Sequence, residues 1–178
     1  NATETFLANS MSGEFRWQRV EQRHMVYLKH VSADIHPGLK LDDANGELQW
    51  DAHGHEGVLT VKKFALEQGE LFAKWLDSQS QAANYLEHIA PSGNASQIKL
   101  RWLKQKDKWQ DYDVEAHLNA IHSKAYEQIP GLKNWSGHLT LHPNSGNIDL
   151  DTQNASIDLA AVLRWPVPID HLQGNIEW

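Results

Sequence analysis

Alternation of apolar and polar residues is clearest in the last third of the chain, between Gly131 and Trp178. Three short runs there, residues 138–142, 147–151 and 157–159, carry an aliphatic residue at every second position. Successive side chains of a strand point to opposite faces, so each run predicts a strand with one apolar and one polar face. Turn-forming residues separate the runs, and the pattern therefore predicts an antiparallel meander.

The same alternation recurs upstream, and residues 112–120 hold its longest run. Five apolar residues there alternate with polar ones: Tyr112, Val114, Ala116, Leu118 and Ala120. A slip of one residue would move the whole set into water, so the register of this strand is strongly specified. Shorter runs at residues 14–18, 24–35, 47–51, 58–66 and 98–102 predict further strands. In the run 58–66, the pair Lys62-Lys63 interrupts the alternation and predicts a bulge.

One segment has helical periodicity instead. Apolar residues between Gly69 and Ile89 recur at spacings of three and four, and Pro91 follows. This predicts one helix, or two short ones with a break near Ser78. The fold class expected is mainly β: a curved antiparallel sheet forming a groove, with one short helical segment near residues 70–90 packed at one end or across its mouth.

An internal similarity suggests how the sheet is organised. Residues 41–50 and 169–178 share an acidic residue, a glycine and an aliphatic residue, and they end in Trp50 and Trp178. One hairpin unit used repeatedly along an extended sheet would produce such a match. We therefore expect residues 1–178 to form a single fragment of a longer, repeated β-groove, with the helical segment as an insert.

Composition excludes several classes of protein. The chain is 40% hydrophobic and 22% charged, and no stretch approaches the roughly 20 apolar residues of a membrane-spanning helix. A net charge of −7 without a basic run argues against nucleic-acid binding. The absence of cysteine excludes disulfides, thiolate metal sites and cysteine nucleophiles.

Candidate chemistry is sparse. The chain has neither a glycine-rich phosphate loop nor a serine nucleophile elbow, and the carboxylate pairs Asp42-Asp43 and Asp111/Asp113 are typical of turns and solvated faces. Eleven histidines include the pairs His53/His55 and His138/His142, but most lie on predicted outward faces without a third converging ligand. We predict no catalysis, no metal and no cofactor.

Eight tryptophans are the unusual feature of the composition. Trp50, Trp102 and Trp178 fall at strand ends on predicted apolar faces, whereas Trp109 lies in a charged loop. Packing at the core and edges explains them most simply. They could also form a rim that contacts lipid headgroups, or stacking platforms for sugars.

Several short motifs resemble the YhdP family, the AsmA-like periplasmic proteins of Gram-negative bacteria. They cover residues 85–178 well and the first half loosely, and their order and spacing carry the resemblance. The motifs are APSG at residues 90–93, IKLRW at 98–102, YDV at 112–114, PGL at 130–132, SG at 136–137, IDL at 157–159 and WPVPI at 165–169. Ala160-Ala161 departs from the pattern, which has a proline after the Asp-Leu pair.

The resemblance implies a periplasmic protein whose inner-membrane anchor lies outside these residues. It also implies that a long β-groove carries phospholipid between the inner and outer membranes. Which outer-membrane partner receives the lipid is unknown. An apolar inner face would solvate the acyl chains. The expected groove residues are Leu48, Trp50, Leu59, Val61, Ile98, Leu100, Val114, Ala116, Leu118, Leu139, Leu141, Ile148, Leu150, Ile157, Leu159, Ile176 and Trp178.

Two other functions fit the same strands. A carbohydrate-binding β-sandwich module would gather its aromatic side chains on one flat exposed face. A structural spacer or docking segment would have an ordinary closed core and no ligand. In each case the strand that ends at Trp178 leaves an unpaired edge, so edge-to-edge self-association of this fragment is expected.

Overall fold

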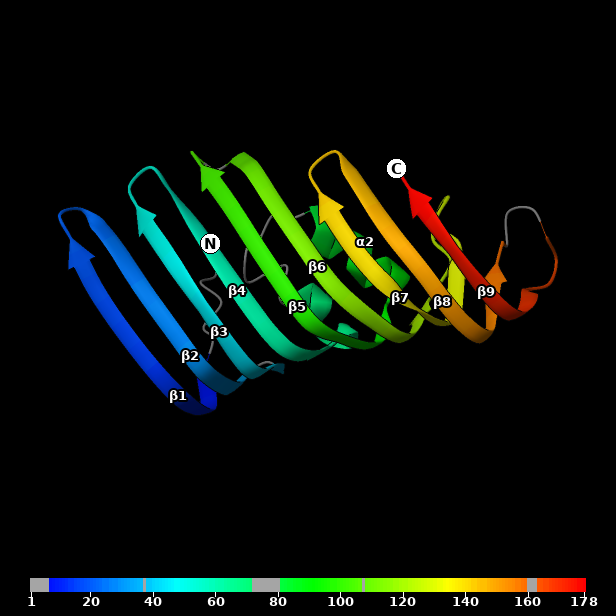
Figure 1. Ribbon diagram of the computed structural model, residues 1–178, viewed down its shortest axis with the longest axis horizontal. Coiled ribbons are helices and arrows are strands. Elements are labelled where there is room, and N and C mark those ends of the chain that lie inside the picture. The colour runs from blue at the N-terminus through cyan, green and yellow to red at the C-terminus, as the bar shows by residue number, and fades with distance from the viewer. Residues whose placement is uncertain (1–6, 37, 72–80, 107, 160–162) are drawn as a thin grey trace.

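A computed structural model describes residues 7–36, 38–71, 81–106, 108–159 and 163–178. Its nine strands form one antiparallel sheet in which every strand pairs with its neighbours in sequence, in the order β1 to β9 (Figure 1). This confirms the mainly β fold. The strands are β1 Leu7–Val20, β2 Arg23–His36, β3 Leu39–Asp51, β4 Gly54–Ala65, β5 Ser92–Gln105, β6 Lys108–Ser123, β7 Gly131–His142, β8 Ser145–Asp158 and β9 Val167–Glu177.

The two long edges of this sheet, where strands reverse direction, are built differently. Along the upper edge in Figure 1 the connections are short: residues 21–22, 52–53 and 143–144 each join two strands, and β6 begins at Lys108 soon after β5 ends at Gln105. We call this edge, with the strand ends that flank it, the upper rim. The longer connections, between β4 and β5, β6 and β7, and β8 and β9, join the opposite, lower ends of these strands. The longer connecting segments therefore all start and end at the same edge of the sheet.

The strands bend because left-handed residues interrupt them in two rows. In the first row Gly13, His30, Asp43 and Gln97 have positive φ. In the second row the positive-φ residues are Gly93, Ala120, Asn134 and Asn154. Register shifts accompany His30, Gln97 and Ala120, as expected of β-bulges, which bend a strand and increase its twist.

The prediction of a bulge at Lys62-Lys63 is wrong, because the pairing of β4 is regular at these residues. β4 pairs with β3 and with β5 without a register shift at this point. The alternation of exposure does change there, because Val61 is buried and both lysines are exposed. The neighbouring strands have left-handed residues at the same level, Asp43 and Gln97, so all three strands change direction together and the ladder stays in register.

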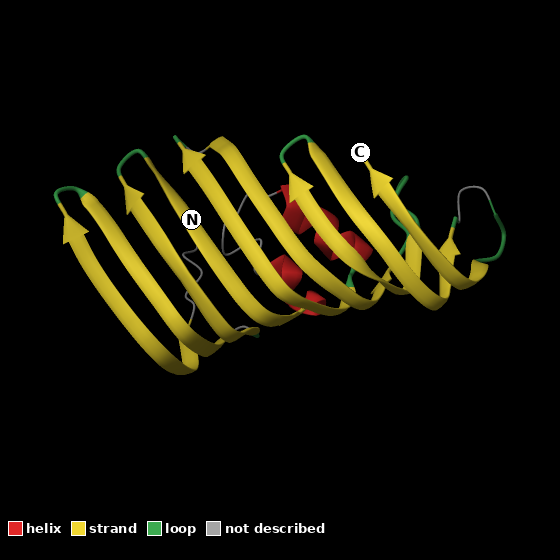
Figure 2. Cartoon of the chain, viewed as in Figure 1, coloured by secondary structure: helices red, strands yellow, loops and turns green. Residues whose placement is uncertain are grey.

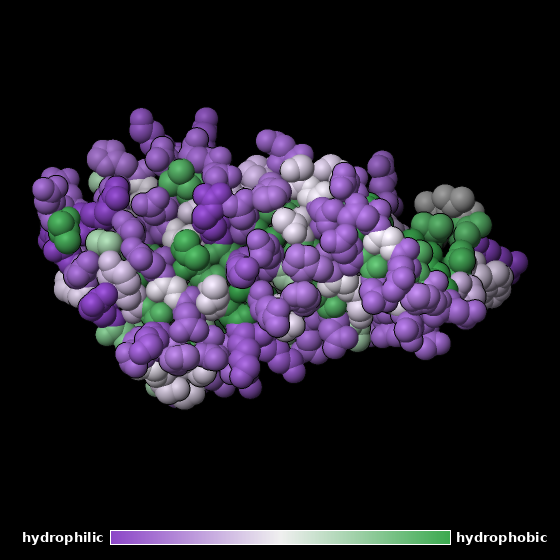
Figure 3. Space-filling view, viewed as in Figure 1, coloured by the Kyte–Doolittle hydropathy of each residue, from purple (hydrophilic) through white to green (hydrophobic). Residues whose placement is uncertain are grey.

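Bending gives the sheet a convex and a concave face. The strands curve away from the viewer at their lower ends in Figure 1, so the viewed face is convex. Figure 3 shows that this face is mostly hydrophilic. The apolar side chains therefore gather on the concave face, where they form two clusters. One is centred on Val31, Ala44, Leu59, Val61 and Trp102, and the other on Ile121, Trp135, Leu150 and Ala155.

The helical segment lies behind the sheet, on its concave side (Figure 2). It comprises the 3-10 turn η1 Leu66–Gln68, which continues as helix to residue 71, and the helix α2 Gln81–Ile89. Leu66 packs against the second apolar cluster, and the backbone N–H of Lys124 donates to Ile89 O over 2.7 Å. The expected helical segment is thus confirmed on the concave side of the sheet, while the expected break near Ser78 lies outside the described residues.

Candidate functional site

The concave face is a continuous apolar surface because cross-strand partners place like residues side by side. One row joins Leu59, Leu100, Val114 and Leu141 across β4 to β7. A second row joins Ala116, Leu139, Ile148 and Ile176 across β6 to β9. Directly paired residues share a face of a sheet, so these rows run along the concave surface from strand to strand.

Most residues expected to line the groove lie on this face. Leu59, Val61 and Leu150 are in the two clusters, and partly buried aliphatic residues pack against them. Those packing residues include Leu48, Ile98, Leu100, Leu118, Ile148 and Ile157. Trp50, Ile176 and Trp178 lie toward the rims and are exposed, and Leu159 follows the end of β8. Contact of any of them with a lipid stays a prediction.

Sequence reasoning missed several residues of the same face below the second row of bulges. Ile121, Trp135 and Ala155 are buried in the second cluster although none was expected there. Each follows a left-handed residue (Ala120, Asn134 and Asn154), which changes the face to which the following side chains point. Asparagine is enriched in the left-handed conformation, so Asn134 and Asn154 were the signals that could have revealed the change.

The concave face is not closed by a second layer in the part of the chain that the structure describes. The nine strands form a single sheet, and the helical segment is the one element on its concave side. Leu139, Leu141 and Val114 are consequently only half-buried. Among the residues that the structure describes, Thr152 is the one buried polar side chain, and its Oγ1–H donates to Asn134 O over 2.8 Å.

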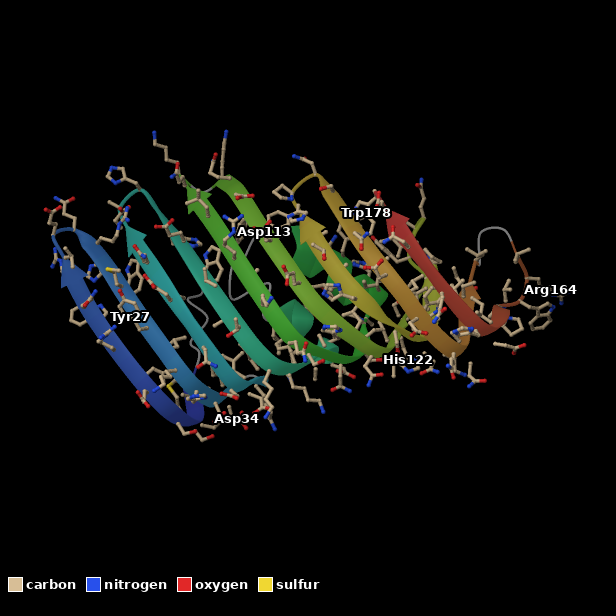
Figure 4. The ribbon with its side chains drawn as sticks, in the orientation of Figure 1. Tyr27, Asp34, Asp113, His122, Arg164 and Trp178 are labelled. Carbon is tan, nitrogen blue, oxygen red and sulfur yellow. The ribbon has the colours of Figure 1, made fainter. Side chains whose placement is uncertain are left out.

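Aromatic residues gather along the upper rim. Trp17, Trp50, Trp102, Trp109 and Trp178 all lie near the upper ends of their strands. Figure 4 labels Trp178 at the upper end of β9. The rings of Trp17, His24 and Trp50 stack in sequence, with centroid distances of 5.8 and 5.3 Å and interplanar angles of 23° and 10°. The rim thus carries amphipathic side chains that have an apolar body and a polar N–H.

A hollow of about 480 Å³ opens at this rim between the β3–β4 hairpin and the end of β5. Leu48, Trp50 and Trp102 form its apolar part, and the charged residues that line it are Asp51, Glu56, Lys104 and Lys106. The Trp102 indole Nε1–H donates to His55 Nδ1 over 3.0 Å, and Lys104 Nζ lies 5.5 Å from the centre of the Trp109 ring. Apolar, aromatic and cationic groups therefore meet at one point of the groove margin.

The convex face carries ion pairs. Arg101 bridges Asp111 and Asp113, and His142 Nδ1 lies 2.5 Å from Asp113 Oδ1 (Figure 4 labels Asp113). The hydrogen bond from His142 and then the Arg101 guanidinium hold the pKa of Asp113 below its ordinary value. His30 lowers the pKa of Asp43 in the same way. These exposed networks fit a solvated outer surface.

The histidine pairs do not assemble a metal centre. His55 accepts from Trp102, and the His138 ring lies 4.7 Å from His117. Over residues with described positions, three His, Asp or Glu side chains nowhere converge as metal ligands. In the same part of the chain, the helices are too short and too polar to cross a membrane.

Comparison with known proteins gives one match. A family model described as YhdP protein matches residues 2–178. No curated protein and no solved structure matches the chain.

Proposed function

The chain belongs to the YhdP family, and from that premise we propose that it is a segment of a periplasmic lipid-transfer protein that carries phospholipid between the inner and outer membranes without catalysis. The observation that supports this most directly is the asymmetry of the sheet. Its concave face is apolar across successive strands, its convex face is polar, and no second sheet covers the concave face in the described residues.

Acyl chains gain free energy on such a surface. Each buried methylene contributes roughly 0.8 kcal/mol, so one chain of about sixteen carbons could gain on the order of 10 kcal/mol. Nine strands spaced about 4.8 Å apart give a groove of about 40 Å, which is long enough for an extended acyl chain. Because the rows continue from strand to strand, a lipid can move along the groove while it keeps its apolar contacts.

The carbohydrate-binding alternative has less support. A β-sandwich needs two packed sheets, whereas the nine strands form one. Sugars stack on exposed ring faces, but Trp17 and Trp50 each turn a face toward His24, which lies between them. The spacer alternative predicted an ordinary closed core, whereas no second sheet covers the concave face in the described residues. Its other expectation, the lack of a ligand, is the opposite outcome of the experiment below.

Two adjacent residues of β7 allow a matched test. Leu139 lies in a concave row with Ala116 and Ile148, whereas Thr140 pairs with Glu115 and Asn147 on the opposite face. We would incorporate the photo-crosslinker benzoylphenylalanine at Leu139 or at Thr140, irradiate the protein with phospholipid vesicles, and identify adducts by mass spectrometry. Both sites are half-buried, so reactivity and exposure are comparable.

The expected result is a phospholipid adduct at Leu139 and little or none at Thr140. Replacing Leu141, the neighbour of Leu139 on the same face, by Asp should then reduce the Leu139 adduct, since a charge in the apolar row opposes acyl-chain burial. Equal labelling at both positions, or none at either, would count against the groove and favour the spacer.

A further inference from the structure

The outermost residue row of the concave face, at the upper rim, carries only aromatic and basic side chains from β1 to β6. Strand pairing joins these residues in one continuous row: Arg19, His24, Trp50, His55, Lys104 and Trp109. The next row of the same face is mostly apolar and aromatic, and its residues are Trp17, Val26, Leu48, Gly57, Trp102 and Tyr112. Two residues along a strand span about 7 Å, so the concave face changes from apolar to basic over that distance.

Acidic side chains at this level belong to the other face. Alternation places a convex row between the two concave ones, and it consists of Gln18, Met25, Gln49, Glu56, Leu103 and Asp111. Glu56 and Asp51, the residue after Trp50, each lie 3.6 Å from Arg23. The outermost concave row contains no carboxylate, and Arg19 keeps it cationic even without Lys104.

Arg19 has a cationic group that is free to bind an anion. Its Nε–H donates to Glu21 O over 3.1 Å, which holds the guanidinium at the rim. A guanidinium has five N–H donors. In the part of the chain that the structure describes, the other four meet no acceptor, and Arg19 forms no ion pair, not even with the Glu21 carboxylate. An anion from outside the chain can therefore bind this group.

His24 is held beside Arg19 by its ring faces. It is half-buried, and the rings of Trp17 and Trp50 lie 5.8 and 5.3 Å from it, with interplanar angles of 23° and 10°. Stacking occupies the faces of the imidazole and leaves its two nitrogens, which lie in the ring plane, for hydrogen bonds. Indoles favour the boundary between hydrocarbon and polar groups, so this stack lies where a bound lipid would change from acyl chain to headgroup.

We infer that the upper rim over β1 to β3, at the upper left in Figure 1, is a headgroup subsite for a phospholipid whose acyl chains lie in the groove. Arg19 binds two phosphate oxygens through paired N–H groups, a geometry that suits a guanidinium, and His24 donates one further hydrogen bond. Trp17 and Trp50 contact the glycerol and the first methylenes. This inference rests on the proposed function, and it adds the position and the chemistry of headgroup recognition.

Two lipids that differ only in the phosphate, dioleoylphosphatidic acid and dioleoylglycerol, test the subsite. The protein is incubated with dioleoylphosphatidylcholine vesicles that contain small, equal amounts of both, and is then re-isolated. Mass spectrometry gives the ratio of the two lipids retained. The variant R19Q is compared with R16Q, which removes an exposed arginine of the same strand. Arg16 lies on the convex face, where its guanidinium carbon is 4.5 Å from the centre of the Tyr27 ring.

We expect wild type and R16Q to retain phosphatidic acid preferentially. R19Q should lower the ratio about three- to tenfold, as for one charge-assisted contact at an exposed site, while retention of dioleoylglycerol is unchanged. H24F keeps a ring between the two indoles but removes the donor, and it should lower the ratio about two- to fivefold.

The subsite and the groove can fail separately. An unchanged ratio in R19Q, or an equal fall in R16Q, would overturn the subsite and leave the groove proposal intact. An unchanged ratio in H24F would overturn the contact of His24 with the phosphate. Retention of no lipid by wild type would overturn both the subsite and the proposed function.

A second measurement identifies the source of the phosphate. Trp17 and Trp50 flank His24, so their fluorescence reports on an anion bound there. Inorganic phosphate alone should give no saturable change in this fluorescence, because the acyl chains supply most of the binding free energy. Saturable binding of inorganic phosphate that R19Q abolishes would assign the site to free phosphate and overturn the lipid subsite.

Discussion

Trp102 Nε1 donates a hydrogen bond of 3.0 Å to His55 Nδ1, which joins β5 to β4 on the concave face. An indole nitrogen can only donate, so His55 must accept at Nδ1 and carry its proton on Nε2. The Trp102 ring is 4% exposed and lies directly against Gly57, where an added Cβ would be 2.5 Å from ring atom Cζ2. The floor of the hollow at the upper rim therefore depends on a glycine.

Gly57→Ala should destabilise the protein. The methyl group must displace a buried indole together with its hydrogen bond, and overpacking of this kind costs about 1–3 kcal/mol. Gly174→Ala is the matched control, because a Cβ there meets no atom within 4 Å. Urea unfolding gives both values, and equal stabilities for the two variants would show that Trp102 can move without cost.

Because of the left-handed bulge in β6, two alanines of this strand should lose different amounts of stability when replaced by glycine. Ala120 has φ of 51°, a conformation that costs an L-residue about 1–2 kcal/mol, whereas Ala116 is buried outside the bulges. Relief of this strain should offset the entropic cost of glycine, so Ala120→Gly should change stability by less than about 1 kcal/mol. Ala116→Gly should lose about 1–2 kcal/mol, because it has no strain to relieve and also loses a buried methyl group.

Urea unfolding monitored by circular dichroism distinguishes the two alanine variants. A loss at Ala120 as large as at Ala116 would contradict the role of left-handed strain there. The comparison also tests how the sheet curves, since Ala120 is one of the residues at which the second row of bulges bends the strands.

Alternation alone was sufficient to predict the strands and the face of most side chains. Val114, Ala116 and Leu118 keep strict period two, and the structure pairs them with Leu141, Leu139 and Gly137 as that period requires. The helical segment was predictable for a similar reason, because its apolar residues recur at helical spacing. These features depend on the local pattern of residues and can therefore be predicted from a single sequence.

The bends were not predictable in the same way. Each bulge adds a residue to one strand relative to its partner, so its position depends on the neighbouring strand and not on local alternation. Ile121 and Trp135 therefore point to the other face than simple alternation predicts, although the pattern of apolar residues around them gives no sign of the change. The hollow also escaped prediction, because Trp50, Trp102 and Lys104 come from strands whose register becomes known only once they are paired.

Stability should depend on pH through Asp113 on the convex face. The hydrogen bond from His142 and then the Arg101 guanidinium lower the pKa of Asp113 from its ordinary value of 3.8. A pKa that is lower in the folded than in the unfolded chain stabilises the fold above the unfolded value, and this contribution is lost as the pH falls through the folded pKa. Asp113→Asn should therefore reduce stability at neutral pH, and its difference from wild type should shrink below about pH 4.

Unfolding free energies from pH 7 downward check this dependence. Asp42→Asn is the control, since Asp42 is exposed and the described residues offer it no ion pair. A difference between wild type and Asp113→Asn that stays constant to pH 3, or that grows on acidification, would contradict the assigned contacts.

Two tryptophans differ in burial: one packs in the lower part of the concave face and the other lies in an exposed connection. Trp135 is 9% exposed, belongs to the second apolar cluster, and donates its Nε1–H to Ser156 O over 2.7 Å, whereas Trp165 is 71% exposed. Trp135→Phe removes the donor from the carbonyl of half-buried Ser156 and removes ring atoms from the cluster, which together should cost about 2–4 kcal/mol. Trp165→Phe should change stability by less than about 0.5 kcal/mol. Urea unfolding of both variants checks this prediction: if Trp135→Phe is as stable as Trp165→Phe, the second apolar cluster depends neither on the Trp135 ring nor on its hydrogen bond.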